Sequence, residues 1–287
     1  MKIIESIDEM QEYSQQLKND GKTIGLIDTE GNLHNGHMSL VKIAKDNVDV
    51  VILGICHTLY YFEHSTEKYE IHLKLYKQDF IEKEIKICEL NNVDVLFLPS
   101  MDDLYTNSST ISLDSLPLNV QNFLQTPPIN IKFILGAKEL YNIILPDITV
   151  LGQKDVYQTF ILKSLIKQLN LSIKVIMIPT IRDSDGLASS SRNRYLSDSE
   201  RQDATSIYQT LHEVSRWSTY PSIAKIKEHI TNRINQANGD ISYIDICCSE
   251  TLKELDSIDR EAVIVVAAKF GEIDLTDNII IKPRGIK

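Results

Sequence analysis

The chain has 287 residues, of which 43% are hydrophobic and 24% charged, a composition that excludes a fibrous or largely disordered protein. Its formal net charge of −10 at pH 7 argues against a nucleic-acid binder, because such a protein needs a basic face toward the phosphates. No apolar run approaches the roughly 20 residues that span a bilayer, and the N-terminus lacks a signal-peptide core. We therefore expect a cytoplasmic protein with two domains that acts on small molecules, without nucleic-acid or membrane partners.

The first part of the chain alternates strand-like and helix-like segments. Residues 23–27 form a β-rich run, a Gly-containing turn follows, and an apolar-periodic stretch at 38–44 completes a strand, a loop and a helix. The same patterns predict strands at 48–56, 93–98, 110–113, 148–151 and 172–178, and helices at 69–90, 137–144 and 156–169. Because such alternation favours a parallel sheet with right-handed crossovers, we predict an α/β fold whose N-terminal domain, residues 1–180, is Rossmann-like.

A long loop rich in Ser, Asp and Gly, at 182–193, marks the junction between the domains. Beyond it, the patterns predict helices at 198–215 and 222–237, and strands at 241–247, 262–268 and 274–281. This order fits a smaller α+β C-terminal domain, residues 181–287, which we expect to act as a lid.

The cysteines follow no metal-ligand spacing such as Cys-x-x-Cys. Cys247 and Cys248 are adjacent in a predicted strand, where successive side chains face opposite ways. We predict that these two, together with Cys56 and Cys88, are buried or half-buried free thiols rather than disulfides.

The segment 33–37 reads Leu-His-Asn-Gly-His and falls between the first predicted strand and its helix. Open α/β sheets bind ligands there, at the carboxyl ends of their strands. The helix N-terminus offers N–H groups to a phosphate, Gly36 lets the backbone come close, and His34 and His37 can hydrogen-bond phosphoryl oxygens. Two alternatives stay open. In one, His34 caps the helix and His37 is a surface residue; the other is a zinc site, whose third ligand the spacing does not supply.

Two further polar segments suit a nucleotide. In the turn that begins at Gly152, this glycine permits close backbone approach, Lys154 can meet a β- or γ-phosphate, and Asp155 can accept ribose hydroxyls. The segment 189–193 reads Ser-Ser-Ser-Arg-Asn and offers hydroxyls and a guanidinium group to polyphosphate. Taken singly, the first segment is better interpreted as an ordinary polar turn, and the second as a solvated Ser-rich linker.

Together, in this order and at these separations, the three segments resemble the pantothenate synthetase family of the HIGH-motif nucleotidylyltransferase superfamily. The resemblance covers essentially the whole chain, including Asp277-Asn278 near its end. It implies an enzyme that joins an acid, pantoate in the family, to an amine, β-alanine, through an acyl-adenylate. It also implies ATP and Mg²⁺ as cofactors, AMP and pyrophosphate as products, and a homodimer.

By motif position, the resemblance assigns adenylyl transfer to His34, His37 and Lys154. It assigns ATP binding to Gly36, Gly152, Lys154, Asp155, Ser190, Ser191 and Arg192. The metal ligands stay unassigned, with Asp79 and Glu84 as unresolved candidates.

The positions expected to hold the acid and the amine depart from the family pattern. The chain reads Asp-Thr-Glu-Gly at 28–31, where the family has Pro-Thr-Met-Gly, and Thr-Pro-Pro-Ile-Asn at 126–130, where it has Arg-Pro-Gly-His-Phe. Ser189 replaces a family Met. The predicted substrate-binding residues are Asp28 and Glu30 in the changed first segment, Thr58 and Tyr61 in place of a family Asn and Gln, and Gln158, which matches a pantoate-contacting Gln.

Because the nucleotide motifs persist while the acid and amine positions change, we expect an active ligase with a different acid or amine. Buried carboxylates at Asp28 and Glu30 are costly unless a cation pairs with them, which favours a substrate that carries an ammonium group. The alternative is that both face solvent or an internal Lys or Arg. Two rival functions also stay open: nucleotidyl transfer without amide formation, and a non-catalytic paralogue with a binding role.

Overall fold

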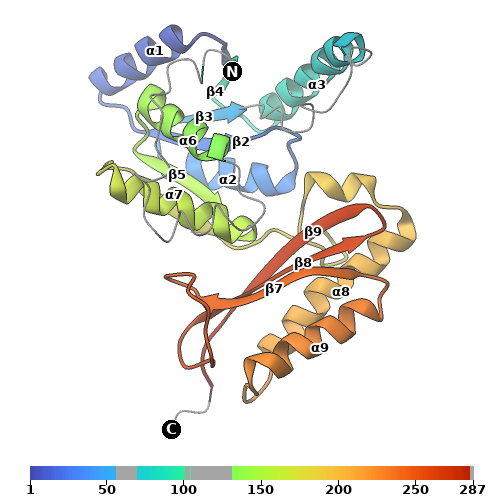
Figure 1. The fold of residues 1–287 in the computed structure, drawn as a ribbon. Coiled ribbons are helices and arrows are strands. Elements are labelled where there is room, and N and C mark those ends of the chain that lie inside the picture. The colour runs from blue at the N-terminus through green and yellow to red at the C-terminus, as the bar shows by residue number, and fades with distance from the viewer. Residues whose placement is uncertain (56–69, 101–103, 105–130, 285–287) are drawn as a thin grey trace. The chain divides into compact units, whose positions relative to one another are not determined.

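The computed structural model describes residues 1–55, 70–100, 104 and 131–284. The chain divides into two compact units (Figure 1). The first comprises Met1–Gly152 and Tyr157–Ile178, and the second comprises Gln153–Val156 and Pro179–Lys287. The short segment 153–156 therefore belongs to the second unit, although it lies between two elements of the first.

The first unit is built on a six-stranded parallel sheet in the order β1-β4-β3-β2-β5-β6. Its strands are β1 (Lys2–Ile4), β2 (Ile24–Thr29), β3 (Val50–Ile55), β4 (Val95–Phe97), β5 (Ile148–Gly152) and β6 (Lys174–Ile178). From β2 the chain moves outward through β3 and β4 on one side, and through β5 and β6 on the other. The boundary between β2 and β5 is therefore the point where the strand order reverses, the usual ligand site of such sheets.

Helices cover both faces of this sheet. They are α1 (Ile7–Asn19), α2 (Asn35–Lys45), α3 (Glu70–Leu90), α6 (Ile131–Ile144) and α7 (Val156–Gln168). One apolar core joins α1, α6 and α7 to one face of the sheet, and a second core joins α2 and α3 to the other. The central strands are apolar on both faces for this reason.

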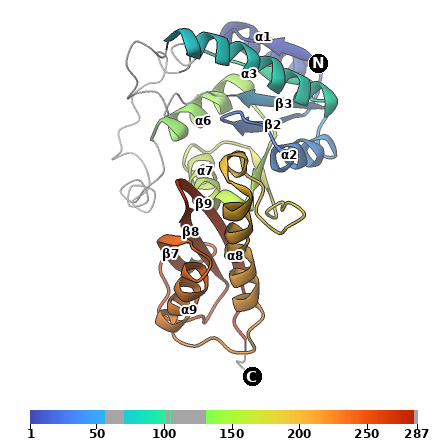
Figure 2. The same cartoon turned by 90° about the vertical axis from the view of Figure 1, so that its right-hand side faces the viewer.

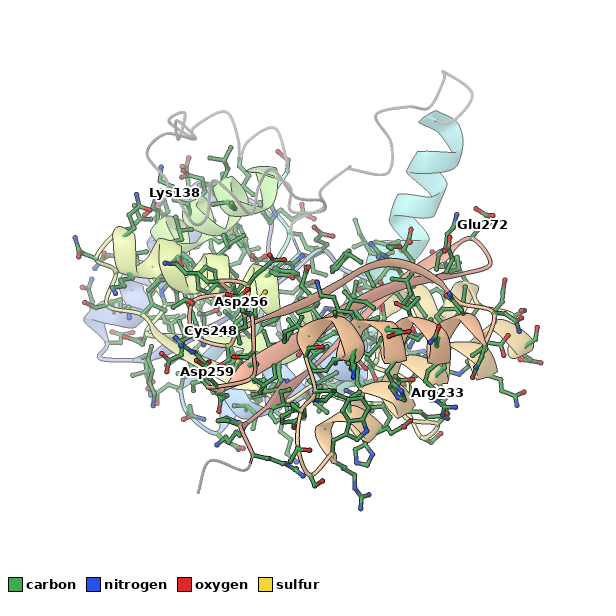
Figure 3. All side chains as sticks on the ribbon, turned by 60° about the horizontal axis from the view of Figure 1, so that its bottom comes forward. Lys138, Arg233, Cys248, Asp256, Asp259 and Glu272 are labelled. Carbon is green, nitrogen blue, oxygen red and sulfur yellow. The ribbon has the colours of Figure 1, made fainter. Side chains whose placement is uncertain are left out.

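The second unit has a three-stranded antiparallel sheet of β7 (Asp240–Cys248), β8 (Ala262–Phe270) and β9 (Ile273–Ile281). Figure 2 shows α8 (Asp198–Ser215) and α9 (Ile223–Asn235) along one face of these strands, where they close an apolar core. Glu272, at the turn between β8 and β9 (Figure 3), pairs with Lys269 at 3.0 Å. The unit also holds two short 3-10 helices, η4 (Gln153–Asp155) and η5 (Ser191–Tyr195).

The predicted fold class is confirmed, because a parallel α/β sheet precedes a smaller unit of helices and antiparallel strands. The predicted helices and strands on described residues all form, with α6 longer at its start than expected. The sequence analysis missed β1 and α1, and the strand expected at 110–113 lies outside the described residues.

Cys88, Cys247 and Cys248 are buried free thiols, as predicted, and Cys56 lies outside the described residues. Of the helices in the described ranges, none combines the length and the apolar character that a membrane crossing requires.

Candidate functional site

The loop between β2 and α2 is held from two sides. Thr29 Oγ1 accepts a hydrogen bond from the Gly31 N–H at 2.8 Å. Gly31 has a φ of 84°, and a Cβ there would lie 2.7 Å from the Phe80 ring, so only glycine fits. The Leu33 N–H donates to Glu84 Oε2 at 2.8 Å, and Glu84 is only 2% exposed. Glu84, left unresolved by the sequence, thus has a structural contact that fixes the approach to α2.

His34 is the N-cap of α2, and its Nδ1 accepts the Gly36 N–H at 3.0 Å. An accepting Nδ1 carries no proton, so Nε2 of the neutral ring carries the N–H. The His37 ring lies one turn away, with its centroid 4.1 Å from that of His34, and both residues are partly buried. The capping alternative is therefore seen for His34.

Asp28 and Glu30, two residues apart, differ in their surroundings. Glu30 is exposed, whereas Asp28 is partly buried. Burial, with a smaller contribution from the Glu30 charge, raises the pKa of Asp28 from 3.8 to about 7. Within the described part of the chain, no lysine or arginine forms an ion pair with Asp28. The alternative in which both carboxylates face solvent therefore holds for Glu30 but not for Asp28.

In the second unit, Asn278 on β9 holds the turn η4. Its Nδ2 donates to the carbonyl oxygens of Gln153 and Lys154, both at 2.8 Å, and its Oδ1 accepts from Gln153 Nε2 at 3.1 Å. Asn278 is 1% exposed. All of its side-chain hydrogen-bonding groups are therefore used to fix the backbone that carries Lys154.

The neighbouring Asp277 forms a buried ion pair with Arg182. The guanidinium group donates to both carboxylate oxygens, at 2.6 and 3.0 Å, and stacks on the Tyr208 ring with its carbon 3.9 Å from the centroid. Asp277 also accepts from the Asn278 N–H at 2.8 Å. The sequence analysis quoted Asp277-Asn278 only as part of a resemblance and missed Arg182. The sequence feature that could have indicated this cluster is the pair of polar residues, Asp277 and Asn278, inside a predicted apolar strand.

Lys154 and Asp155 lie on η4, and their side chains approach each other at 3.5 Å. The Lys154 side chain is 19% exposed and that of Asp155 51%. Burial, then the charges of Asp245 and Asp155, raise the pKa of Tyr243 on β7 to about 12. This phenol therefore remains a neutral hydrogen-bonding group beside the turn throughout the physiological pH range.

The segment after Asp183 is an ordered loop. Asp183 accepts hydrogen bonds from Ser189 Oγ, from Asn193 Nδ2 at 3.3 Å and from Arg201 at 2.8 Å. Ser189, which replaces a family Met, is thus buried and paired. These contacts precede η5 and set the direction in which the chain enters it.

At η5 itself, Ser190 Oγ accepts from the Arg192 N–H at 3.3 Å, and the Arg192 guanidinium donates to the Asp274 carbonyl at 3.1 Å. Ser191 is the first residue of the 3-10 helix. Ser190 and Ser191 are partly buried, and Arg192 is exposed.

The predicted site residues fall into two sets. The first unit holds Asp28, Glu30, His34, Gly36, His37, Gly152 and Gln158, and the second holds Lys154, Asp155, Ser190, Ser191 and Arg192. Thr58, Tyr61 and the side chain of Asp79 lie outside what the structure describes. In that described part, no three His, Cys, Asp or Glu side chains gather into a group that could hold a metal ion.

The chain is similar to one family along nearly its whole length. The sequence pattern of the pantoate-beta-alanine ligase family matches residues 2–280. The pantothenate synthetase of Thermotoga petrophila is 36% identical over 285 residues, which cover 98% of this chain and 100% of that relative. The pantothenate synthetase of Thermotoga neapolitana is 34% identical, with the same two shares.

Solved structures show the same fold. A pantothenate synthetase from Thermus thermophilus matches with a TM-score of 0.80 at 24% identity, over 99% of this chain and 100% of that chain. A pantoate-beta-alanine ligase from Francisella tularensis, complexed with beta-gamma ATP and beta-alanine, matches with a TM-score of 0.71 at 27% identity. That match covers 98% of this chain and 97% of the other.

Proposed function

The chain belongs to the pantoate-beta-alanine ligase family, and on that premise we propose that it joins a carboxylic acid to an amine through an acyl-adenylate, consuming ATP. The observation that carries the proposal is the His34–His37 pair at the start of α2, beside the point where the strand order reverses. The ATP assignment is supported by the Francisella tularensis relative, which was solved with an ATP compound.

In the first step, the substrate carboxylate attacks the α-phosphorus of ATP, an acyl-adenylate forms and pyrophosphate leaves. Negative charge grows on the phosphoryl oxygens as this happens. The Nε2–H of His34 is a donor for these oxygens, and the positive end of the α2 helix dipole favours the same charge. Removal of one such preorganised donor typically costs about 10²–10³ in rate.

We assign Lys154, Asp155, Ser190, Ser191 and Arg192 to the same nucleotide. Lys154 supplies a compact positive charge for the departing pyrophosphate, and Asn278 keeps its backbone in place. Ser190 and Ser191 supply hydroxyl groups, and Arg192 supplies a guanidinium group, for phosphate oxygens. Magnesium enters this proposal only as the usual counter-ion of ATP phosphates, which carry it without a dedicated protein cage.

In the second step, the neutral amine attacks the carbonyl carbon of the acyl-adenylate, the bond to AMP breaks and an amide forms. The amine nitrogen loses a proton in the process. The mixed anhydride is also open to attack by water, so the enzyme must exclude water until the amine arrives. We further propose that the second unit acts as a lid over the first. We also propose that the protein forms a homodimer.

The acid pocket is proposed to differ from that of pantoate-specific relatives. The supporting feature is Asp28, a partly buried carboxyl group without a described cationic partner at the end of β2. Gln158, on the first turn of α7 and partly buried, remains a candidate for contact with the acid.

The test is pyrophosphate release from ATP and Mg²⁺ with a panel of acids and amines that includes pantoate with β-alanine. His34→Asn is the informative variant, because asparagine keeps an N-cap acceptor for α2 while it removes the imidazole. We expect acid-dependent release that falls about 10²–10³-fold in this variant. Release with AMP and an amide as the other products supports the ligase, whereas a stable nucleotidylated product supports simple nucleotidyl transfer. No release with any acid supports a non-catalytic binding role.

A further inference from the structure

Asp28 and a buried tyrosine, Tyr141, face the same side of the central sheet. Side chains alternate along β2, so Asp28 shares a face with Ile24 and Leu26, which belong to the core under α1, α6 and α7. Tyr141 lies on α6, is 2% exposed and belongs to the same core. Burial raises the pKa of the Tyr141 phenol above its ordinary value, and the Asp28 carboxylate adds to this rise.

The neighbouring strand places no side chain beside Asp28. In the parallel register, Asp28 is paired with Gly54 of β3, so the side chain that would stand next to the carboxylate on this face is missing. A Cβ at Gly54 would lie 3.6 Å from Leu140 of α6, an ordinary contact distance. Leu140 therefore forms an apolar wall on this side, and Tyr141 is its neighbour along the helix.

Neither the Asp28 carboxyl group nor the Tyr141 hydroxyl forms a hydrogen bond within the described part of the chain. Among the described residues, the Tyr141 hydroxyl is buried without a partner within hydrogen-bonding distance. The Thr149 hydroxyl on β5 is close enough to the phenol to lower its pKa, but it donates its own proton to the Leu26 carbonyl at 3.3 Å. Asp28 and Tyr141 are thus close enough to interact electrostatically but do not bond directly. A buried polar group left in this state costs free energy, which a bound group with matching donors offsets.

We propose that Asp28 and Tyr141 form the subsite for a protonated amine carried by the acid substrate, so that the acid is an amino acid activated at its own carboxylate. An ammonium group has three N–H donors, and the Asp28 carboxylate and the Tyr141 oxygen are both acceptors for them. Glu30, exposed two residues away, is outside this subsite. The inference rests on the proposed acyl-adenylate chemistry.

The subsite suits the acid rather than the attacking amine for a chemical reason. The amine that forms the amide must have a free lone pair, and a carboxylate partner holds an amine in its protonated form. An ammonium group beside Asp28 is therefore one that does not react. It fixes the position of the acid and leaves the carboxylate of the substrate free to attack ATP.

The experiment is acid-dependent exchange of labelled pyrophosphate into ATP, without any amine, because this reports the first step alone. Each amino acid in the panel is matched with the hydroxy acid of the same carbon skeleton, and pantoate is included. The variants are Asp28→Asn, which removes the charge, Tyr141→Phe, which removes only the hydroxyl, and the control Glu12→Gln, which removes an exposed charge on α1. A thermal shift of the unsubstituted protein by the same acids, with a non-hydrolysable ATP analogue, gives a reading that does not depend on any variant folding.

We expect an amino acid to be preferred over its hydroxy analogue in kcat/KM by at least about tenfold. Asp28→Asn should reduce kcat/KM for the amino acid about 10²-fold and abolish the preference. Tyr141→Phe should reduce it about tenfold, and Glu12→Gln less than about twofold. In the thermal-shift measurement, the amino acid should stabilise the protein and its hydroxy analogue should not.

Other outcomes overturn the inference and are distinguishable from failure of the proposed function. Exchange with pantoate or another hydroxy acid, unaffected by Asp28→Asn, leaves the ligase in place and removes the ammonium subsite. A loss confined to the later amine step makes Asp28 a base that acts on the nucleophile, again against the inference. Exchange with no acid, together with no thermal shift, removes both the inference and the proposed function.

Discussion

The turn η4 and the carboxyl end of β2 both carry polar residues that we assign to substrates, but their local pairing differs. Around η4, the amide of Asn278 is fully bonded and Lys154 lies 3.5 Å from Asp155. At the end of β2, the hydroxyl of Tyr141 is buried without a partner among the described residues, and Asp28 has no described cation. The comparison teaches that the polar groups around η4 are paired within the protein, whereas those at the end of β2 are left for the ligand that we propose there.

The largest change in stability is expected when one member of a buried pair in the second unit is removed. Arg182→Ala leaves Asp277, which is 3% exposed, as an uncompensated buried charge, and we expect a loss of about 3–5 kcal/mol in the free energy of unfolding. Urea unfolding followed by circular dichroism measures it. The control is Arg260→Ala, because Arg260 pairs with Asp259 at the surface, with side chains 61% and 49% exposed. Its loss should stay within about 1 kcal/mol, and equal losses would contradict the contrast.

On the unpaired side, removal of a charge should stabilise the protein. The folded-state pKa of Asp28, about 7 against 3.8 ordinarily, means that the folded protein keeps a proton that the unfolded chain has released. Stability therefore falls as pH rises from about 4 to 7, and the loss is complete above pH 7. Asp28→Asn has no carboxyl group to ionise, so it does not lose stability in this way. We expect its free energy of unfolding to exceed that of the unsubstituted protein by up to about 4 kcal/mol at pH 8 and by almost nothing at pH 4.

Melting temperatures across this pH range measure the Asp28 effect. Glu30→Gln serves as the control, because Glu30 contributes to the shift but is itself exposed, and it should change stability by less than about 0.5 kcal/mol. A pH-independent difference between Asp28→Asn and the unsubstituted protein would contradict the predicted titration.

A smaller effect is expected at the amide that holds η4. Asn278→Ala leaves two backbone carbonyls and the Gln153 amide without their partner, at a cost of about 1–3 kcal/mol. It should also raise KM for ATP, because the backbone of Lys154 is released. A double-mutant cycle with Lys154→Ala separates the two effects: if Asn278 positions Lys154, the two changes in kcat/KM are non-additive. Asn47→Ala, which removes an exposed amide bonded to the Ile43 carbonyl, is the control and should be neutral.

The smallest expected change in stability comes from loss of a helix-capping hydrogen bond in the second unit. Ser197 and Glu200 form a capping box at the start of α8, whereas Ser222 at the start of α9 makes no side-chain cap bond. Ser197→Ala should cost about 1 kcal/mol, and Ser222→Ala only a few tenths. Thermal unfolding of the two variants checks the difference. Similar losses would show that the cap bond itself contributes little.

Local patterns in the sequence sufficed for most of the fold. The strands of the first sheet are short apolar runs, and α8 carries both an apolar stripe and a capping pair, so periodicity predicts them. The missed β1 has only three residues, too few to show a period. The missed α1 is amphipathic but contains few apolar residues, and only Met10, Ser14 and Leu17 are buried along it.

The candidate site was predictable to a lesser degree. His34 and Lys154 follow strands, but position alone left a capping residue and an ordinary turn open, and the family resemblance made the assignment. The contacts that distinguish Asp28 from Glu30 come from the register with β3 and from α6, more than 100 residues later, and no local pattern contains them. The same holds for Arg182, whose partner Asp277 lies 95 residues further along the chain.

The bond between Asn278 and η4 also orders events during synthesis. The residues of the turn leave the ribosome about a hundred residues before β9, since the two amide bonds to the turn span 125 and 124 positions. Domains generally fold from the N-terminus as the chain emerges, so β5 and α7 can form while the turn between them still lacks its anchor. The nucleotide turn is then among the last parts to be fixed, and a nascent chain that stops before β9 has the sequence of the turn without its support. Under the proposed assignment of Lys154 to ATP, binding of ATP there would show that the chain has been made through β9.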